Sequence, residues 1–454
     1  MARRQPNLLL AELLHEADWG PAQLARSVNA VGAAQGMRLA YDRTSVAHWL
    51  TGSRPNPPIP DLVASALSAR SGRLVTAVDT GLVRHRQPAG DALPRQGEGD
   101  AVERLTALCR ADSEPLKRAR LARTAYSVGA AGASPVWRPK RHVSVRAGDT
   151  GRRVTPADVH RLHGMTKVFS DLMAVHGGAH ARTALTAYLA DDTSRLLAGP
   201  AAPALRPGLF TGAGQLTHLL ARMSMDAGAP GLAQRYFTSA LDLAREADDR
   251  RLYAITLRAM SVQALDLGFG GQARRLAETA VDTTGPVTDP YTASFLLGQR
   301  AAVHACARDR HRAVADLSTA EARYDRASSQ AGPFAGYPRP GFDYQRGQVL
   351  LALGETDRAA QALAAAVEGR AADRHRPLAL VRARLAETLL PLGRLEESCL
   401  HWHAFLDHYP SLESNPADQA LRQMRLSLRG YRRQPDAVAV LQRARAFTGT
   451  RAAP

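Results

Sequence analysis

A pattern of small residues recurs through residues 221–444 with a period near 40 residues. The pattern is Gly-x4-Ala-x6-Ala with another small residue seven positions before the glycine; Arg308 replaces the glycine in the third copy, and Ser398 and Phe405 replace the alanines in the fifth. The glycine position falls at residues 228, 268, 308, 354 and 393, and a weaker copy follows near Arg432. Glycine permits the backbone conformation of a tight turn, and small residues let two helices approach closely. The pattern therefore predicts a series of two-helix units.

Such units bury their apolar faces by stacking on their neighbours, which predicts an all-α chain with an α-solenoid over residues 154–454. Residues 156–199, centred on Gly177 and Gly178, are expected to form an entry helix pair, and a polar C-terminal pair is expected to cap the far end. The pattern resembles the tetratricopeptide repeat, although the period is nearer 40 than 34 and the usual aromatic residues are missing. The alternative is a helical bundle in which alanines recur by chance.

Composition narrows the class of protein further. Aromatic residues are only 5% of the chain, which argues against a β-sandwich or barrel. Cys109, Cys306 and Cys399 are odd in number and far apart, as expected in a reducing compartment. The stretch after the N-terminal Arg3 and Arg4 is interrupted by charge, so it does not read as a signal peptide. These features predict a cytoplasmic protein that spans no membrane.

Positive charge is concentrated in the first third of the chain. The net charge is +17, and residues 1–153 carry 23 Lys and Arg against 13 Asp and Glu. A Pro- and Gly-rich stretch from Gln87 to Asp100 has the composition of a connector. We therefore expect an N-terminal domain at 1–86, a basic linking segment at 87–153 and the repeat domain at 154–454.

Four helices are expected in the first 70 residues: about 7–17, 22–34, 43–50 and a fourth after Pro58. In the third, Val46, Trp49 and Leu50 form an apolar face at helical spacing. Polar and basic side chains are left to face outward. A short helix with this outward face suits readout of the DNA major groove. The predicted DNA-contacting residues are Arg43, Thr44, Ser45 and His48, with Arg54 expected at a phosphate.

The motif from Leu24-Ala25 to Ser45-Val46-x-x-Trp49-Leu50-x-Gly52-x-x-Pro55 resembles the helix-turn-helix domain of Cro/cI-like phage repressors. The connection from Val31 to Tyr41 is longer than in that family. The whole chain is similar to actinobacterial, streptomycete-type regulators that join such a domain to tetratricopeptide-like repeats. Segments 124–128, 177–182 and 231–237 carry that resemblance as well. It implies a transcription regulator, in this group a repressor of differentiation or secondary metabolism, that binds double-stranded DNA as a homodimer.

An alternative function remains open for the N-terminal domain, and it would change the function of the whole chain. Residues 1–60 carry six arginines and four acids, a modest surplus for a DNA-binding domain. The third helix could therefore be the solvated face of a small protein-binding domain. The whole chain would then be a protein–protein interaction scaffold without specific DNA binding.

The first helix of each tetratricopeptide-like pair lines the concave surface of the solenoid. Polar side chains at these positions can bond the backbone and terminal carboxylate of an extended peptide or protein segment. The alternative is a hydrated groove without a ligand, and a small metabolite fits an open groove less well. We count each turn residue as position fifteen of its repeat and take positions five, six and nine as groove positions. The candidate groove residues are then His218, Arg222, Arg258, Gln299, Tyr344, Gln345, Gln348, Arg384 and Glu387.

No motif in the sequence indicates catalysis or a cofactor. Neither a phosphate-binding Gly-x4-Gly-Lys nor a dinucleotide-binding Gly-x-Gly-x-x-Gly is present. Cys399, His401, His403 and His408 lie close together in the sequence, but no second pair of Cys or His residues has the spacing of zinc ligands. A core cysteine with solvated histidines is the preferred interpretation. We therefore expect a protein that is not an enzyme and that has no cofactor and no metal.

Overall fold

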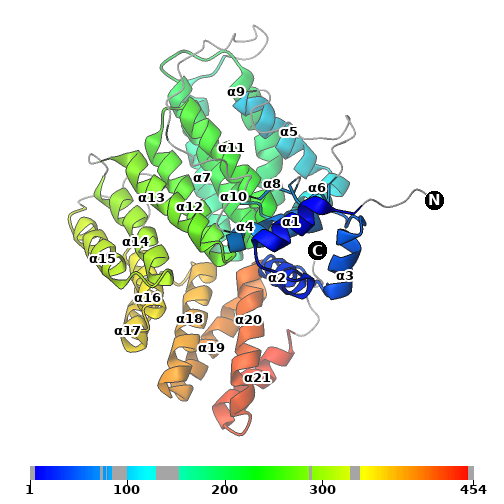
Figure 1. The fold of residues 1–454 in the computed structure, drawn as a ribbon. Coiled ribbons are helices and arrows are strands. Elements are labelled where there is room, and N and C mark those ends of the chain that lie inside the picture. The colour runs from blue at the N-terminus through cyan, green and yellow to red at the C-terminus, as the bar shows by residue number, and fades with distance from the viewer. Residues whose placement is uncertain are drawn as a thin grey trace. The chain divides into compact units, whose positions relative to one another are not determined.

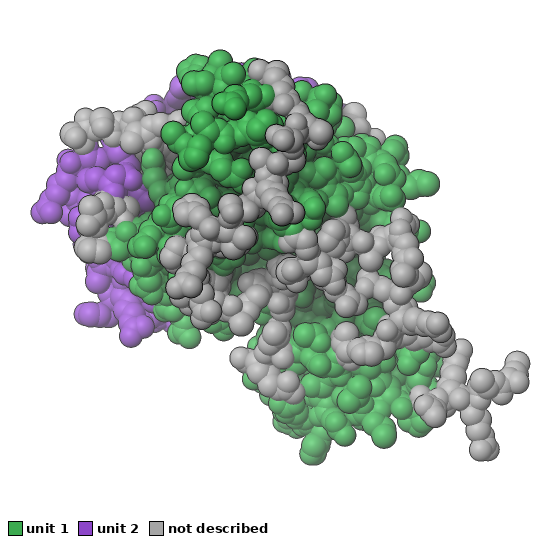
Figure 2. Space-filling model, turned by 90° about the horizontal axis from the view of Figure 1, so that it is seen from above, with its two compact units in different colours: residues 1–166, 183–287 green, residues 167–182, 288–454 purple. Residues whose placement is uncertain are grey.

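The computed structural model describes residues 6–71, 75–77, 79–83, 100–128, 137, 153–285, 289–327 and 338–447. All regular structure in these residues is helical (Figure 1). None of their helices is both long enough and apolar enough to cross a bilayer. The chain divides into two compact units, shown in green and purple in Figure 2. Unit 1 comprises residues 1–166 and 183–287, and unit 2 comprises residues 167–182 and 288–454.

The N-terminal part of unit 1 is a group of four helices around one apolar core. Leu10, Leu24, Val46 and Leu62 are fully buried in this core. Asn7 ties the group together, because its backbone N–H donates to the carbonyl of Leu50 at 2.8 Å and its side chain caps the first helix. The four helices are α1 (Leu8–Glu16), α2 (Pro21–Ala34), α3 (Arg43–Leu50) and α4 (Ile59–Ser71).

The segment predicted as a basic link contains two helices, α5 (Ala101–Ser113) and α6 (Pro115–Ala122). Both pack on helix α11 (Pro230–Glu246) of the repeats. Arg104 pairs with Asp242 at 2.6 Å, and the Arg118 guanidinium bonds two backbone carbonyls at the end of α5. Part of the positive charge of this segment is therefore used to hold it on the repeats. Residues 87–99 and 129–152 of this segment, apart from Trp137, lie outside the described residues.

The repeats begin in unit 1 with two helical hairpins. Each pair of consecutive helices packs along its length, and α11 also packs on α12, so the hairpins stack on each other. The first hairpin joins α10 (Arg206–Asp226) to α11, and the second joins α12 (Arg250–Asp266) to α13 (Gly270–Thr284).

Unit 2 continues the same architecture. Its hairpins are stacked, since α14 packs on α16 and α17 packs on α18. The order of its elements is α14 (Pro290–Cys306), α15 (Arg310–Asp325), α16 (Arg339–Ala352), α17 (Thr356–Glu368), α18 (His375–Leu389), η2 (Leu390–Leu392), α19 (Leu395–His408), η3 (Tyr409–Ser411), α20 (Asn415–Ser427), η4 (Leu428–Tyr431) and α21 (Pro435–Arg445).

The small residues of the repeat pattern occupy the positions that the sequence predicts. The Ser261 hydroxyl donates to the carbonyl of Ala273 at 2.8 Å, and Ser398 makes the same bond to Ala386 at 2.8 Å. Each bond joins the two helices of one hairpin at positions of the pattern. In the fourth hairpin, α16–α17, a Cβ added to Gly347 would lie 2.8 Å from Leu363 Cγ, so glycine permits this close approach. The two-helix units and their stacked, solenoid-like packing within each unit are therefore confirmed.

All five turn positions of the pattern have left-handed backbone conformation. The φ angles are 80° at Gly228, 84° at Gly268, 79° at Gly354 and 74° at Gly393. Arg308, which replaces glycine in the third copy, has φ 61°. A non-glycine residue pays a steric cost in this region, so the hairpin geometry is set by packing strongly enough to impose it.

Residues 156–199 form α7 (Pro156–His176), α8 (Gly178–Tyr188), the π-helical η1 (Leu189–Thr193) and α9 (Ser194–Ala198). The predicted turn lies at Gly177, which has φ 94°. It packs on the residues before α20, because a Cβ on Gly177 would lie 2.5 Å from the carbonyl oxygen of Glu413. Within unit 2 this turn therefore contacts the segment before α20, near the end of the repeat series.

Candidate nucleic-acid interface

Helix α3 has one buried face and one exposed face. Val46 is fully buried, Trp49 is 4% exposed, and the Trp49 ring packs edge-on against Tyr41 with 5.1 Å between centroids. Arg43, Thr44 and His48 are exposed on the other side. The apolar spacing therefore divides the helix as the sequence predicts.

The N-terminus of α3 is held by a capping box. The Ser45 backbone N–H and the Ser45 hydroxyl both bond Asp42 Oδ1 at 2.8 Å. These hydrogen bonds from Ser45 lower the pKa of the Asp42 carboxyl. The Ser45 hydroxyl therefore has a structural partner already, and its availability to a base is lower than that of Arg43.

The basic side chains on and next to α3 have no such partners. In the described part of the chain, no hydrogen bond or ion pair engages the side chains of Arg43, His48 or Arg54, and all three are exposed. Arg38, in the connection before α3, is exposed and unpaired within the same residues. Sequence reasoning did not select Arg38, because its charge was the only signal. Two of these four side chains lie on the exposed face of α3 and two flank the helix in the sequence, and within the described residues none of them forms an ion pair.

The connection between α2 and α3 is fixed despite its length. Asn29 Nδ2 donates to the carbonyl of Tyr41 at 2.8 Å, and the Tyr41 N–H donates to Asn29 Oδ1 at 3.0 Å. Gly32 permits the return of the chain, because a Cβ there would lie 2.3 Å from Leu39 Cδ1. The long loop therefore presents α3 in a defined orientation on α2.

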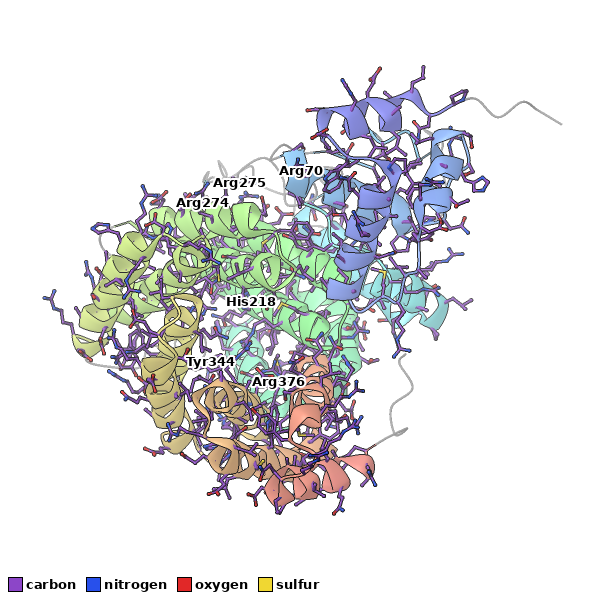
Figure 3. All side chains as sticks on the ribbon, turned by 60° about the horizontal axis from the view of Figure 1, so that its bottom comes forward. Arg70, His218, Arg274, Arg275, Tyr344 and Arg376 are labelled. Atoms are coloured by element: carbon purple, nitrogen blue, oxygen red, sulfur yellow. The ribbon has the colours of Figure 1, made fainter. Side chains whose placement is uncertain are left out.

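The candidate groove residues of unit 1 differ in exposure. His218 is 2% exposed, and its Nδ1 lies 3.1 Å from the Thr256 hydroxyl (Figure 3). Burial, followed by the charges of Arg222 and Arg258, lowers its pKa well below the usual value. Arg222 is exposed and Arg258 is half-buried. His218 is thus an interior side chain in this structure, and the two arginines are the accessible members.

The candidates in unit 2 divide in the same way. Gln299 and Gln345 are buried, and Gln345 Nε2 donates to Gln299 Oε1 at 3.1 Å. Tyr344 and Gln348 are half-buried and bonded to each other at 2.9 Å (Figure 3). Arg384 is exposed and pairs with Glu387 at 3.1 Å. The count from the turn places every candidate on the first helix of a hairpin, but it does not distinguish interior polar side chains from accessible ones.

The Cys and His residues of α19 do not gather into one site. Cys399 is 2% exposed, and burial raises the pKa of its thiol to about 11. His401 Nδ1 lies 3.5 Å from the Arg382 guanidinium, and the His408 ring packs on His375 with 5.1 Å between centroids. Within the described ranges, no three His, Cys, Asp or Glu side chains are arranged to hold a metal ion.

The comparison with protein families finds one match. The family described as SP15 N-terminal domain matches residues 10–83. This range begins in α1 and ends just after Leu82, the last residue of the N-terminal core before the connector. No curated protein matches the chain.

Proposed function

We propose that this protein is a cytoplasmic DNA-binding transcription regulator, in which residues 1–86 form a helix-turn-helix domain and the repeats sense a peptide or protein ligand. The observation that carries the proposal is the exposed face of α3. The side chains of Arg43 and His48 are exposed on it without an intramolecular partner among the described residues, and Arg38 and Arg54 flank the helix in the sequence. Its opposite face is fixed in the core by Val46 and Trp49. A rigid helix with uncompensated cations on its outer face suits recognition of a polyanion.

Docking follows from the geometry of that face. The N-terminal half of α3 would enter the major groove, where the Arg43 guanidinium can donate two hydrogen bonds to one guanine. Thr44 and His48 would reach neighbouring base edges. Arg38 and Arg54, which lie before and after the helix in the sequence, would bind phosphates and set its register.

The repeats would supply regulation rather than affinity. An extended peptide could bond Arg222 and Arg258 in unit 1, or Tyr344, Gln348 and Arg384 in unit 2, through its backbone and terminal carboxylate. A ligand that prefers one arrangement of the stacked hairpins would shift the population toward it. In a homodimer, this shift changes the spacing of the two DNA-binding domains.

The test is sequence-specific retention of DNA by the purified full chain. Fluorescence anisotropy is measured on fragments from upstream of its own gene and on scrambled fragments of equal length, between about 50 and 200 mM salt. We expect tighter binding to one native fragment and a linear fall of log affinity with log salt. Equal, weak binding to both sets of fragments would reject the proposal.

The second candidate is an interaction scaffold in which residues 1–86 only dock on the repeats. The observation that favours it is the set of hydrogen bonds between the N-terminal helices, segment 124–127 and α11. Under this hypothesis DNA binding is absent, and the exposed arginines on and next to α3, which are Arg38, Arg43 and Arg54, contact an acidic partner protein. The DNA experiment therefore separates the two candidates.

A further inference from the structure

Residues 124–127, here named the strap, lie between the N-terminal helices and the first repeat hairpin within unit 1. On the N-terminal side, the Tyr126 N–H donates to Gln35 Oε1 at 2.8 Å. The Ser65 hydroxyl of α4 donates to the Tyr126 carbonyl at 3.2 Å. Ala125 belongs to the apolar core of the N-terminal helices. The strap is thus part of the N-terminal domain, although it follows that domain by about 40 residues in the sequence.

On the other side, the strap is bound by the repeats. The Ser127 N–H donates to Gln234 Oε1 at 3.0 Å, and Gln234 Nε2 donates to the Ser127 carbonyl at 2.6 Å. The Tyr126 ring stacks on Phe269, at the turn of the second hairpin, with 5.3 Å between centroids. One peptide segment therefore makes specific contacts with the N-terminal domain and with both hairpins of unit 1.

The close approach of the strap to α11 depends on one glycine. A Cβ on Gly231 would lie 2.2 Å from the carbonyl oxygen of Thr124 and 2.6 Å from that of Ala125. These are backbone atoms, so a side chain at 231 would push the strap away. Segments 124–128 and 231–237, which are far apart in the sequence, are thus two halves of one contact.

The hydrogen bonding between the strap and its neighbours is incomplete. Gln35 Nε2 and the Tyr126 hydroxyl are buried, and neither has a hydrogen-bond partner among the described residues. An unpaired buried polar group destabilises the state that buries it. The strap therefore combines specific geometry with a free-energy cost that is relieved on opening, which is a property of an element that switches between two states.

We propose that the strap couples the repeats to the DNA-binding domain: when closed it fixes the N-terminal domain on the first two hairpins, and when open it releases that domain. A change in the packing of α11 or of the turn at Phe269 would act on the strap through Gln234 and Tyr126. The regulatory half of the proposal, which is the coupling of the strap to DNA binding, rests on the proposed function. The closure of the strap does not depend on that function.

Amide hydrogen exchange of the full chain tests closure directly, because the Tyr126 and Ser127 amides are the donors of two of these bonds. Gln234→Ala removes both bonds to Ser127, and Gly231→Ala forces the strap from α11. Exchange of the peptide covering 121–128 should become about tenfold faster in each variant, since each loses contacts worth about one hydrogen bond or more. Tyr126→Phe, which removes only the unpaired hydroxyl, should exchange as slowly as wild type or more slowly.

The matched control is Gln361→Ala, at an exposed glutamine of α17, which should leave exchange of the strap unchanged. Circular dichroism confirms that each variant retains its helices. Wild-type exchange of the strap in Gln234→Ala and Gly231→Ala would overturn the proposal. So would exchange in Tyr126→Phe as fast as in those two variants, because the hydroxyl would then be a required partner.

A second arm adds the upstream DNA fragment. We assign DNA binding to the closed state, which holds the N-terminal domain in one orientation. Coupling is reciprocal, so bound DNA should slow exchange of the strap and of residues 231–237 in wild type but not in Gln234→Ala. If DNA protects α3 but leaves the strap unchanged in wild type, the regulatory half of the proposal fails. If DNA protects neither, the proposed function fails, and closure of the strap is judged on the DNA-free arm.

Discussion

Asn29 and Tyr41 are joined by a pair of hydrogen bonds in which one amide side chain satisfies both backbone groups of a residue twelve positions away. The Asn29 amide thereby acts as a short piece of backbone that closes the loop between α2 and α3. Tyr41 then packs on Trp49, so the same contact also fixes α3 on the N-terminal core.

Replacing Asn29 by alanine should destabilise the N-terminal domain by about 1–3 kcal/mol, because two partly buried backbone groups lose their partner. The measurement is denaturant unfolding followed by the fluorescence of Trp19 and Trp49, in a background in which the other two tryptophans, Trp137 and Trp402, are replaced by phenylalanine. Asn56→Ala is the control, since Asn56 is exposed and its side chain bonds no described residue. A loss equal to that of the control would show that the amide bridge does not stabilise the loop.

Arg43→Ala should weaken binding to specific DNA by about 1–3 kcal/mol and leave binding to scrambled DNA much less affected. The reason is the loss of two hydrogen bonds to one base in the major groove. Arg195→Ala removes the same charge from an exposed arginine that pairs with Asp191, and it should change neither affinity. Equal losses on both DNAs would instead place Arg43 at a phosphate.

The turn positions give a pair of opposite predictions. Gly268→Ala should cost about 1–2 kcal/mol, because alanine must adopt φ near 84° although no atom lies within 4 Å of its Cβ. Arg308→Gly removes the same strain, so it should not destabilise the chain and should raise the melting temperature slightly. Thermal unfolding measures both. A clear destabilisation by Arg308→Gly would mean that the arginine side chain contributes more than its backbone strain costs.

Acidification should destabilise the repeats through His218. Its pKa is lowered in the folded state, mainly by burial, so below about pH 6.5 the unfolded chain binds a proton that the folded chain does not. The free energy of unfolding should therefore fall with decreasing pH, by about 1 kcal/mol per pH unit near pH 5–6. Burial lowers the pKa values of His401 and His408 as well, and they add to the same trend.

His218→Gln, which retains a side chain able to bond Thr256, should flatten this pH dependence. His311→Gln, at an exposed position, should leave it as steep as in wild type. Urea unfolding at several pH values between about 5 and 7.5 gives the slopes. An unchanged slope in His218→Gln would exclude His218 as the titrating group.

Ligand sensing should depend on the accessible candidates rather than on the interior ones. Arg258→Ala, Tyr344→Ala and Arg384→Ala combined should abolish a change in DNA affinity caused by a cell-derived peptide fraction, because these side chains would bond its backbone and carboxylate. The basal DNA affinity should stay the same. A triple variant that folds and still responds would move the search for the ligand site to another surface.

Much of the architecture follows from local sequence. A small residue every few positions and a left-handed turn at a fixed interval specify hairpins, because helix approach and turn conformation are short-range steric properties. The same is true of α3, whose bounds and buried face follow from the spacing of Val46, Trp49 and Leu50 and from the Asp42 cap. The composition change after residue 86 predicts the end of the N-terminal domain, and this bound stays a prediction.

Tertiary structure alone decided which polar side chains are accessible and which distant segments meet. His218 and Gln345 occupy groove positions by counting, yet they are buried, because exposure depends on what the neighbouring hairpin covers. The pairing of the strap with α11 joins residues more than 100 positions apart. No local pattern encodes it: Gly231 is an ordinary helix residue in the sequence, and it becomes indispensable only because two backbone carbonyls pass within contact distance of its missing side chain.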